Sequence, residues 1–447
     1  MKYLVVELIR KKRDGYALNA DEIAFLVKGF CDGSIPDYQI SSWLMAVFYK
    51  GMTPEETHLL TREMKNSGEQ LKWRDRDPSF LSAKFADKHS TGGVGDKVSL
   101  ILAPVAACLG LKIPMMSGRG LGFTGGTVDK FQSIAGFKLD LPDAERTRVL
   151  KETGICMMAQ SETLCPADRK LYALRDVTCT VESLSLITSS IVSKKWAAGV
   201  ENIVYDVKCG SAAFMNSLPK AKELALSLVN VSKLAGMKAT ALITRMDEPL
   251  GAFIGNALEV RECIFILKNS YPEDFHEYLA APLAQLSCRL AAEMAVLAGL
   301  YPVVEEAYNE ALRCLTDGRA WEVFQKMIRA QGGTEDWHET LPKPIISIPF
   351  KSPKPGYLKA IHSRYLGLAG IKLKAGRELS TDVIDPTTGF ELFKGVGQKI
   401  ERHEILCLAH LKNEAQLKEI EADLLSAFEI SDTPVSAPPE LVLEKIS

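Results

Sequence analysis

Two apolar stretches decide the fold of this chain: NIVYDVK at 202–208 and TALIT at 240–244. Both are short and rich in β-branched residues, as expected of strands buried on both faces. Between them, Pro219 opens a helix and Gly236 closes it. Strand, helix and strand in this order predict a parallel sheet covered by helices.

The same alternation begins near residue 80. A glycine-rich turn at 91–95 leads into an apolar helix over 97–109, and the strand-like KIPMMS follows at 112–117. We therefore expect a large mixed α/β domain, with a mostly parallel sheet, over residues 75–166 and 198–340.

Helical periodicity dominates the first 70 residues, where we expect three helices. The third helix is predicted to begin after Thr53, which is a suitable N-cap, because Glu56 can complete a capping box with it. Residues 167–197 have helical periodicity too, and we interpret them as a return of the chain to this unit. The prediction is a small all-helical domain over 1–70 and 167–197, with a linker at 73–78.

Proline and glycine become frequent from residue 345 onward, around short alternating segments. This pattern predicts a small C-terminal α+β domain over 345–447 that ends in a helix near 413–428.

Composition narrows the classes of function. The 447 residues carry 54 Lys+Arg against 56 Asp+Glu, a net charge of −2, which argues against a nucleic-acid binder with a broad basic face. Ten scattered cysteines form no CxxC pair, and no apolar run is long enough to span a membrane. The seven histidines form no HExxH motif, which disfavours metal-dependent hydrolysis. We expect a cytoplasmic protein with reduced thiols that binds neither nucleic acid nor membrane.

The first glycine-rich loop, KHSTGGVGDKVS at 88–99, has the features of a phosphate site. Its glycines let the backbone approach a ligand, and a helix begins directly after them. Lys88 adds a charge, while Ser90, Thr91 and Ser99 add hydroxyl groups. The loop lacks the GxxxxGK[ST] spacing of a Walker A motif. A plain surface turn is the alternative.

The second loop, SGRGLGFTGGTVDK at 117–130, contains Gly120-x-Gly122-x-x-Gly125 with Asp140 twenty residues on. This spacing formally matches the dinucleotide fingerprint, so a nicotinamide dehydrogenase is one alternative. Two such loops after neighbouring strands favour a different interpretation, in which one anion is clamped between them.

Five motifs in register carry a resemblance to a known family. They are KHSTGGVGDK (88–97), SGRGLGFTGGTVDK (117–130), PADRKLYALRDVT (166–178), SSIVSKK (189–195) and DVKCGSAAFM (206–215). Together they resemble the thymidine phosphorylase / pyrimidine-nucleoside phosphorylase family, over nearly the whole chain. The resemblance implies an active site in a cleft between a helical and an α/β domain, and a homodimer through the helical domain. It also implies reversible phosphorolysis of a pyrimidine nucleoside, in pyrimidine salvage or catabolism.

The resemblance also assigns residues. Phosphate, the nucleophilic co-substrate, would be held by Lys88, Ser90, Ser99, Ser117 and Thr127. The base would be held by His89, Tyr172, Arg175, Ser190 and Lys194, of which His89, Arg175 and Lys194 would be catalytic. The leaving base gains negative charge, which Arg175 and Lys194 can stabilise and to which His89 can donate. No organic cofactor is expected.

Some family members bind a monovalent cation, for which K⁺ is the expected ion. The matching positions are Gly95, Lys97, Leu250, Phe253 and Glu262. Because Lys97 is itself a cation, only its backbone could serve there. The chain departs from the family pattern at Phe123, at Phe131 with Gln132, and at Ala135, which affects loop dynamics and packing more than ligands.

Three interpretations remain open at this point. Thymidine is favoured over uridine because APVAACLGLKIPM (103–115) looks closer to thymidine-preferring members. A phosphoribosyltransferase of the anthranilate type is a second interpretation, but its Mg²⁺–pyrophosphate chemistry needs an acidic pair that we do not find. A non-catalytic binding protein on the same fold is the third.

Overall fold

The structure is a computed structural model of the chain and describes residues 3–120, 122, 125–379, 381–436, 438 and 440–447. Phe123, one of the departures named above, lies outside the described residues. None of the described helices is long and apolar enough to cross a membrane. All ten cysteines are free thiols, as expected.

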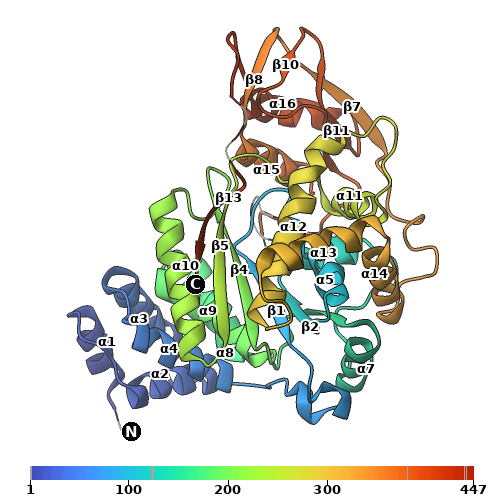
Figure 1. Cartoon of the computed structure of the whole chain (residues 1–447). Coiled ribbons are helices and arrows are strands. Elements are labelled where there is room, and N and C mark those ends of the chain that lie inside the picture. Colours follow the sequence, from blue (N-terminus) through green and yellow to red (C-terminus); the bar gives the residue numbers. More distant parts are fainter. Residues whose placement is uncertain (1–2, 121, 123–124, 380, 437, 439) are drawn as a thin grey trace.

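A mostly parallel sheet forms the centre of the molecule, as predicted (Figure 1). Its parallel strands are β1 (Ala86–Ser90), β2 (Ile113–Ser117), β3 (Ile155–Ala159), β4 (Asn202–Cys209) and β5 (Lys238–Arg245). β1, β4 and β5 pair in that order, β2 pairs with β3, and a parallel bridge between Phe85 and Lys112 joins the two groups. Every residue of β4 is buried, which explains the unbroken apolar stretch in the sequence.

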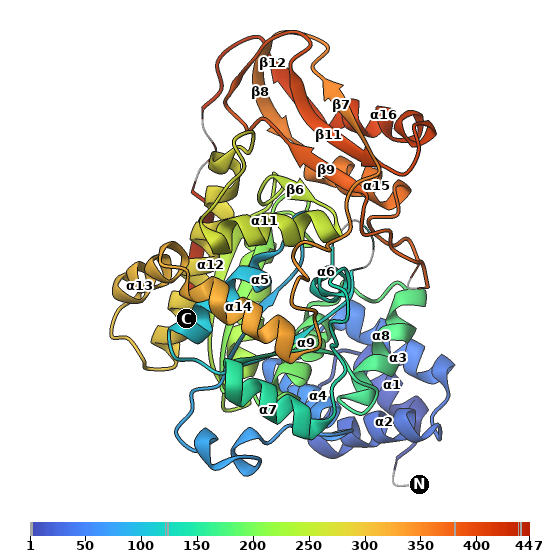
Figure 2. The ribbon, with the colours of Figure 1, turned by 90° about the vertical axis from the view of Figure 1, so that its right-hand side faces the viewer.

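Helices cover both faces of this sheet. α10 (Leu218–Leu234) packs on β4 and β5 from one side, and α12 (Glu277–Leu297) packs on them from the other. The second layer also contains α5 (Val98–Cys108), α7 (Asp143–Thr153), α11 (Asn256–Lys268), α13 (Val304–Thr316) and α14 (Arg319–Ala330) (Figure 2). Residues 98–106 of α5 are buried on all sides, so this helix lies within the core.

The N-terminal segment forms four helices, where the sequence predicts three. They are α1 (Val5–Arg13), α2 (Ala20–Asp32), α3 (Asp37–Lys50) and α4 (Pro54–Asn66). The additional helix is α1. Its sequence is rich in charged residues, so the apolar positions Val5 and Leu8 did not indicate a helix. The predicted capping box of Thr53 and Glu56 is confirmed.

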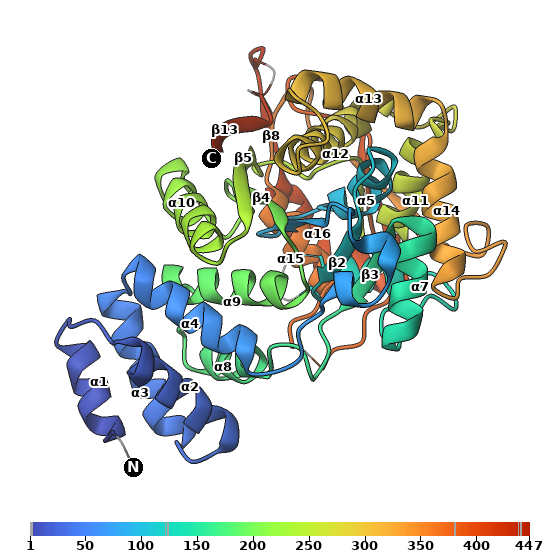
Figure 3. The ribbon, with the colours of Figure 1, turned by 60° about the horizontal axis from the view of Figure 1, so that its bottom comes forward.

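Two later helices pack against this N-terminal group. α8 (Pro166–Val177) contacts α2, α3 and α4, and α9 (Leu184–Ala197) contacts α4 on one side and α10 on the other (Figure 3). Residues 167–197 therefore do return to the helices of residues 1–70, and α9 joins these helices to the sheet.

The C-terminal segment forms two small sheets with two helices. Its elements are β7 (Ile346–Lys351), β8 (Gly356–Ile361), α15 (Ser363–Lys372), β9 (Gly389–Leu392), β10 (Lys399–Ile400), β11 (Ile405–Leu411), α16 (Ala415–Ala427) and β12 (Phe428–Ser431). The short strand β6 (Phe253–Ile254) of the α/β part pairs with β9, so the two parts share a sheet (Figure 2).

The prediction that the C-terminal domain extends over 345–447 is wrong for its last strand. β13 (Val442–Ile446) leaves that domain and pairs antiparallel with β5 of the central sheet (Figure 1). An exposed edge strand offers unpaired N–H and C=O groups, and β13 satisfies those of β5.

Candidate active site

The predicted phosphate residues gather at one edge of the central sheet. Lys88 and Ser90 lie on β1, Ser117 ends β2, and β1 runs parallel to β4. In a parallel sheet the carboxyl ends of the strands share one edge, where ligands of α/β proteins bind. Both glycine-rich loops leave the sheet at this edge.

The first loop is organised around Asp96, which the sequence analysis did not single out. The Ser90 hydroxyl donates to the Asp96 carboxylate and accepts from the Gly92 N–H at 3.2 Å. Ser99 is buried in the first turn of α5, where backbone N–H groups and the helix dipole favour an anion. The loop is thus fixed before any ligand arrives.

Charges of both signs surround Lys88. Burial lowers the pKa of its ammonium group, and attraction from Asp96 and Asp206 opposes this shift. Burial raises the pKa of Asp96, but Lys88 and Lys208 outweigh that effect and hold it below its usual range. Lys208 pairs with Asp206 at 2.7 Å, both without solvent exposure. A phosphate entering here meets buried ammonium groups that need no reorganisation.

The second loop is folded back on itself. The Gly120 N–H donates to Asp129 at 2.6 Å, and Thr127 begins α6 (Thr127–Gln132). Gly126 lies so close to the opposite segment of the loop that a Cβ there would be 2.0 Å from the Gly120 nitrogen. The six-residue helix after this folded loop differs from the strand–turn–helix that a dinucleotide fingerprint requires.

The C-terminal domain holds this second loop, a contact that the sequence gives no means of finding. Arg377 donates to the Asp129 carboxylate at 2.7 Å, and the Gly122 N–H donates to the Arg377 carbonyl at 2.8 Å. Residues 122 and 377 are 255 positions apart in the chain, so no local pattern joins them.

Two of the departures from the family pattern belong to packing. Phe131 is buried and stacks on Phe137 at 4.9 Å between ring centroids. The Gln132 side chain accepts a hydrogen bond from Arg119 at 2.8 Å. Phe131 therefore belongs to the core, and Gln132 holds Arg119 of the second loop.

The base-side residues lie on α8 and α9. The Lys194 ammonium donates to Asp168 at 2.5 Å and to the Ser190 hydroxyl at 2.8 Å, so the predicted shared face of Ser190 and Lys194 is confirmed. Asp168 is buried and ties the start of α8 to α9. Two N–H groups of Lys194 are used by these partners, and the side chain stays one-fifth exposed.

Arg175 has a structural task in addition to the predicted one. Three of its five N–H groups donate to the carbonyl oxygens of residues 180, 181 and 186, at 3.3, 2.6 and 3.1 Å. The guanidinium also lies 5.7 Å from the ring centroid of Tyr172. Arg175 therefore fixes the turn between α8 and α9 and positions Tyr172, whose side chain is 40% exposed.

Lys195, a neighbour that sequence reasoning passed over, joins the two parts of the site. Its ammonium donates to Asp87 at 2.5 Å and to the Met116 carbonyl at 2.7 Å, ahead of both glycine-rich loops. The side chain of Lys195 is buried. A lysine in the last turn of a helix usually interacts with solvent and the helix dipole, so its spacing gives no sign of this role.

His89 lies on β1, directly after Lys88. Burial lowers its pKa well below 6.5, and the nearby positive charges of Lys195, Lys194 and Lys88 lower it further. The imidazole is therefore neutral at pH 7 and carries no charge.

This assignment predicts the pH behaviour of His89. In a histidine NMR titration its ring is expected to stay neutral at about pH 6.5, where an unperturbed histidine is half protonated. Because the folded pKa lies below the unfolded one, the unfolded chain binds more protons, and the His89 contribution to stability is lost as the pH falls below about 6.5. His89→Gln should remove that part of the pH dependence. A normal titration of His89 would contradict the assignment.

The predicted cation positions also come together, with one difference. The Lys97 side chain pairs with Glu262 and donates to the Phe253 carbonyl, and the Leu250 carbonyl oxygen lies beside Gly95. For a bound metal ion the sequence leaves Lys97 a backbone role only; in the structure its side-chain ammonium takes part as well, by pairing with Glu262.

The comparisons with known proteins agree with this geometry. Residues 82–321 match the family described as "Glycosyl transferase family, a/b domain", and residues 6–68 match its helical bundle domain. Residues 357–431 match the "Pyrimidine nucleoside phosphorylase C-terminal domain". The fold and the site therefore define a glycosyl transferase of this helical-plus-α/β class.

Curated relatives identify the family within this class. The chain is 42% identical over 446 residues to a pyrimidine-nucleoside phosphorylase of Geobacillus stearothermophilus, covering 99% of this chain and 100% of the relative. It is also 42% identical to the Staphylococcus aureus (strain MSSA476) protein of that name, over 97% of both chains. The chain belongs to the pyrimidine-nucleoside phosphorylase family.

A solved structure shows the same fold at lower similarity. Anthranilate phosphoribosyltransferase from Thermus thermophilus superposes with a TM-score of 0.57 at 17% identity, covering 72% of this chain and 98% of that chain. This likeness concerns the fold alone.

Proposed function

We propose that the protein catalyses the reversible phosphorolysis of pyrimidine nucleosides, with thymidine as the preferred substrate. Thymidine and phosphate would give thymine and 2-deoxyribose 1-phosphate, in cytoplasmic pyrimidine salvage or catabolism. The observation that carries the proposal is that Lys88 and His89 lie on β1 directly after Asp87, which binds Lys195 of α9, the helix that also carries Lys194. The full-length similarity to curated phosphorylases supports the same reaction.

Phosphate is the nucleophile in this proposal, so the protein must hold it but need not bond to it. Lys88 with the hydroxyls of Ser90 and Ser99 would bind it from the first loop. Ser117 and Thr127 would bind it from the second. Holding the anion in line with the sugar C1′ converts a bimolecular encounter into an oriented one. Such orientation can lower the activation free energy by about 7 kcal/mol or more.

The base would leave toward α8 and α9. As the N-glycosidic bond breaks, the sugar gains oxocarbenium character and the pyrimidine gains negative charge. Lys194, held by Asp168 and Ser190, supplies a positioned ammonium for that charge. Neutral His89 would donate an N–H to a base carbonyl. Arg175 would orient Tyr172 along the base and add its remaining N–H groups.

Two other functions have less support than this one. A phosphoribosyltransferase shares the fold, but the solved neighbour of that class covers 72% of this chain, whereas the curated phosphorylases cover 97–99% of it. A non-catalytic binding protein is disfavoured because Lys88, His89 and Lys194 are all in place.

The test is base release from thymidine and from uridine, each with and without inorganic phosphate. We expect phosphate-dependent release, faster from thymidine. Equal or faster release from uridine would overturn the substrate preference and leave the reaction class intact. A folded protein that releases base from neither nucleoside would overturn the phosphorylase proposal and favour the other two.

We also propose a homodimer formed through the helical domain. Large apolar side chains are exposed on its helices, among them Tyr38 at 71%, Tyr49 at 78% and Val177 at 78%. Sedimentation equilibrium should give twice the chain mass of 49.1 kDa, and the monomer mass would contradict the proposal.

A further inference from the structure

The Lys97 ammonium is buried against the oxygen atoms of Glu262 and Phe253. We call these oxygens, together with the backbone over 250–253 that surrounds them, the cage. The ammonium pairs with the Glu262 carboxylate at 2.7 Å and donates to the Phe253 carbonyl at 2.6 Å. Neither side chain of the ion pair is exposed to solvent. The Glu262 carboxylate also accepts the N–H groups of Ala252 and Phe253, at 2.7 and 3.0 Å.

The backbone over 250–253 wraps this pair closely. A Cβ on Gly251 would lie 2.6 Å from a Glu262 oxygen and 2.9 Å from the Lys97 nitrogen, so only glycine fits there. The Leu250 carbonyl oxygen lies 2.8 Å from the Cβ position of Gly95, on the first glycine-rich loop. A carboxylate and inward carbonyl oxygens are the donors that a hard cation takes in a protein.

We propose that the Lys97 ammonium is the resident cation of this cage, so that this chain needs no monovalent metal ion. An ammonium group resembles K⁺ in charge and approximate size, and it occupies the oxygens that a metal ion would need. A second cation beside it would face strong repulsion in surroundings from which water is excluded.

The cage links three parts of the molecule. Lys97 lies near the end of the first glycine-rich loop, directly before α5. Glu262 lies on α11, and Phe253 lies on β6. Because β6 pairs with β9 of the C-terminal domain, the cation fixes the phosphate loop relative to that domain. Loss of the cation should therefore affect both stability and phosphate binding.

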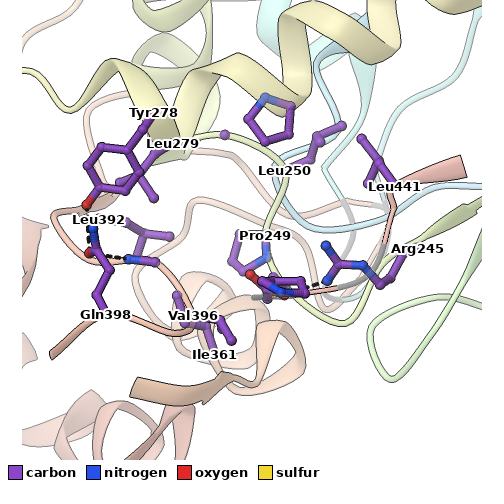
Figure 4. Close-up of a pocket in the computed structure, with 15 residues that line it drawn as sticks. Arg245, Pro249, Leu250, Tyr278, Leu279, Ile361, Leu392, Val396, Gln398 and Leu441 are labelled. Atoms are coloured by element: carbon purple, nitrogen blue, oxygen red, sulfur yellow. Dashed lines mark hydrogen bonds and ion pairs between the residues drawn. The ribbon is translucent and has the colours of Figure 1, made fainter. Parts of the chain in front are cut away.

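A cavity lies beside the backbone that wraps the ion pair. A cavity of about 220 Å³ lies between the α/β part and the C-terminal domain, lined by Leu250 and Gly251 with Arg245, Tyr278 and Val396 (Figure 4). The Gly251 backbone separates this cavity from the ion pair. In a variant with a short side chain at position 97, we expect a cation from solvent to take the place of the ammonium beside Glu262.

The test compares salts of equal ionic strength: KCl, NaCl and choline chloride. The wild-type melting temperature and phosphorolysis rate should be the same in all three. Lys97→Thr should melt at least about 5 °C lower in choline chloride, because removing one partner leaves a buried carboxylate unpaired. KCl should restore most of that loss with saturation, and activity should recover on the order of 10-fold to 100-fold.

Lys12→Thr is the matched control. Lys12 forms a comparably buried pair with Glu56, at 2.9 Å, in the helical domain. This variant should lose stability without any specific recovery by KCl, because its pair is not wrapped by the 250–253 backbone. Crystals soaked in Tl⁺ give a readout that needs no activity: anomalous scattering beside Glu262 is expected in Lys97→Thr and not in the wild type.

Two results would overturn the proposal. One is saturable stabilisation of the wild type by KCl over the other salts, or Tl⁺ beside its Glu262. The other is a folded Lys97→Thr variant that does not respond to KCl. If this variant does not fold in any of the three salts, the wild-type measurements decide alone. The melting experiment does not depend on the proposed reaction, so its failure is distinct from absence of phosphorolysis.

Discussion

Lys194→Met is expected to keep the fold and to lower kcat/KM for nucleoside phosphorolysis by about 10² to 10³. The methionine retains much of the length of the side chain and removes the ammonium that would meet the charge of the leaving base. A preorganised donor of this kind typically contributes that factor to turnover. Steady-state rates with saturating phosphate measure the effect directly.

A structural loss must be separated from this catalytic one, because Asp168 is buried and loses its partner. The double variant Lys194→Met with Asp168→Asn replaces the unpaired carboxylate by a neutral amide. It should recover the melting temperature and leave the rate low. If the double variant instead recovers the rate, Lys194 acts by holding Asp168 and not on the base.

Gly126→Ala is expected to raise KM for phosphate by about 10-fold or more, with the nucleoside KM much less affected. A Cβ at this position would lie 2.0 Å from the Gly120 nitrogen and 2.4 Å from the Arg119 carbonyl carbon, so backbone must move. The displaced segment carries Thr127, and a shift of about 1 Å in a positioning group can cost that factor or more. Overpacking of this kind also costs about 1–3 kcal/mol of stability.

Gly118→Ala in the same loop is the control, because a Cβ there has nothing within 4 Å. It should match the wild type in stability and phosphate KM. Equal phosphate KM values for the two variants would show that the close approach of the second loop does not serve phosphate binding.

The sequence predicted most of the architecture, because the signals that define it are local. The strands at 202–208 and 240–244 and the capping box at Thr53 depend on neighbours within a few positions. The elements that were missed depend on distant parts of the chain. α1 is a helix whose face is completed by α3, and β13 is a strand whose partner lies about 200 residues earlier.

The site divides in the same way. Lys88, His89, Ser90 and Ser99 lie within one loop whose pattern indicates an anion site, and the family resemblance added the residues of α8 and α9. Asp96 and Lys195 were present in the same motifs, yet their roles follow from burial and pairing, which a pattern does not contain. Arg377 reaches the second loop from another domain, so no spacing rule could have indicated it.

The pairing of β13 with β5 sets the order in which the central sheet can be completed on the ribosome. β5 has been synthesised long before the C-terminal domain, and its free edge stays uncovered until residues 442–446 emerge. During that interval the nascent chain presents an open strand edge to its neighbours. A bulky insertion directly after Ile446 would compete with this late step, whereas one placed ahead of α1 would leave it undisturbed. β13 thus covers the edge of β5 only after the other strands of the sheet have been synthesised.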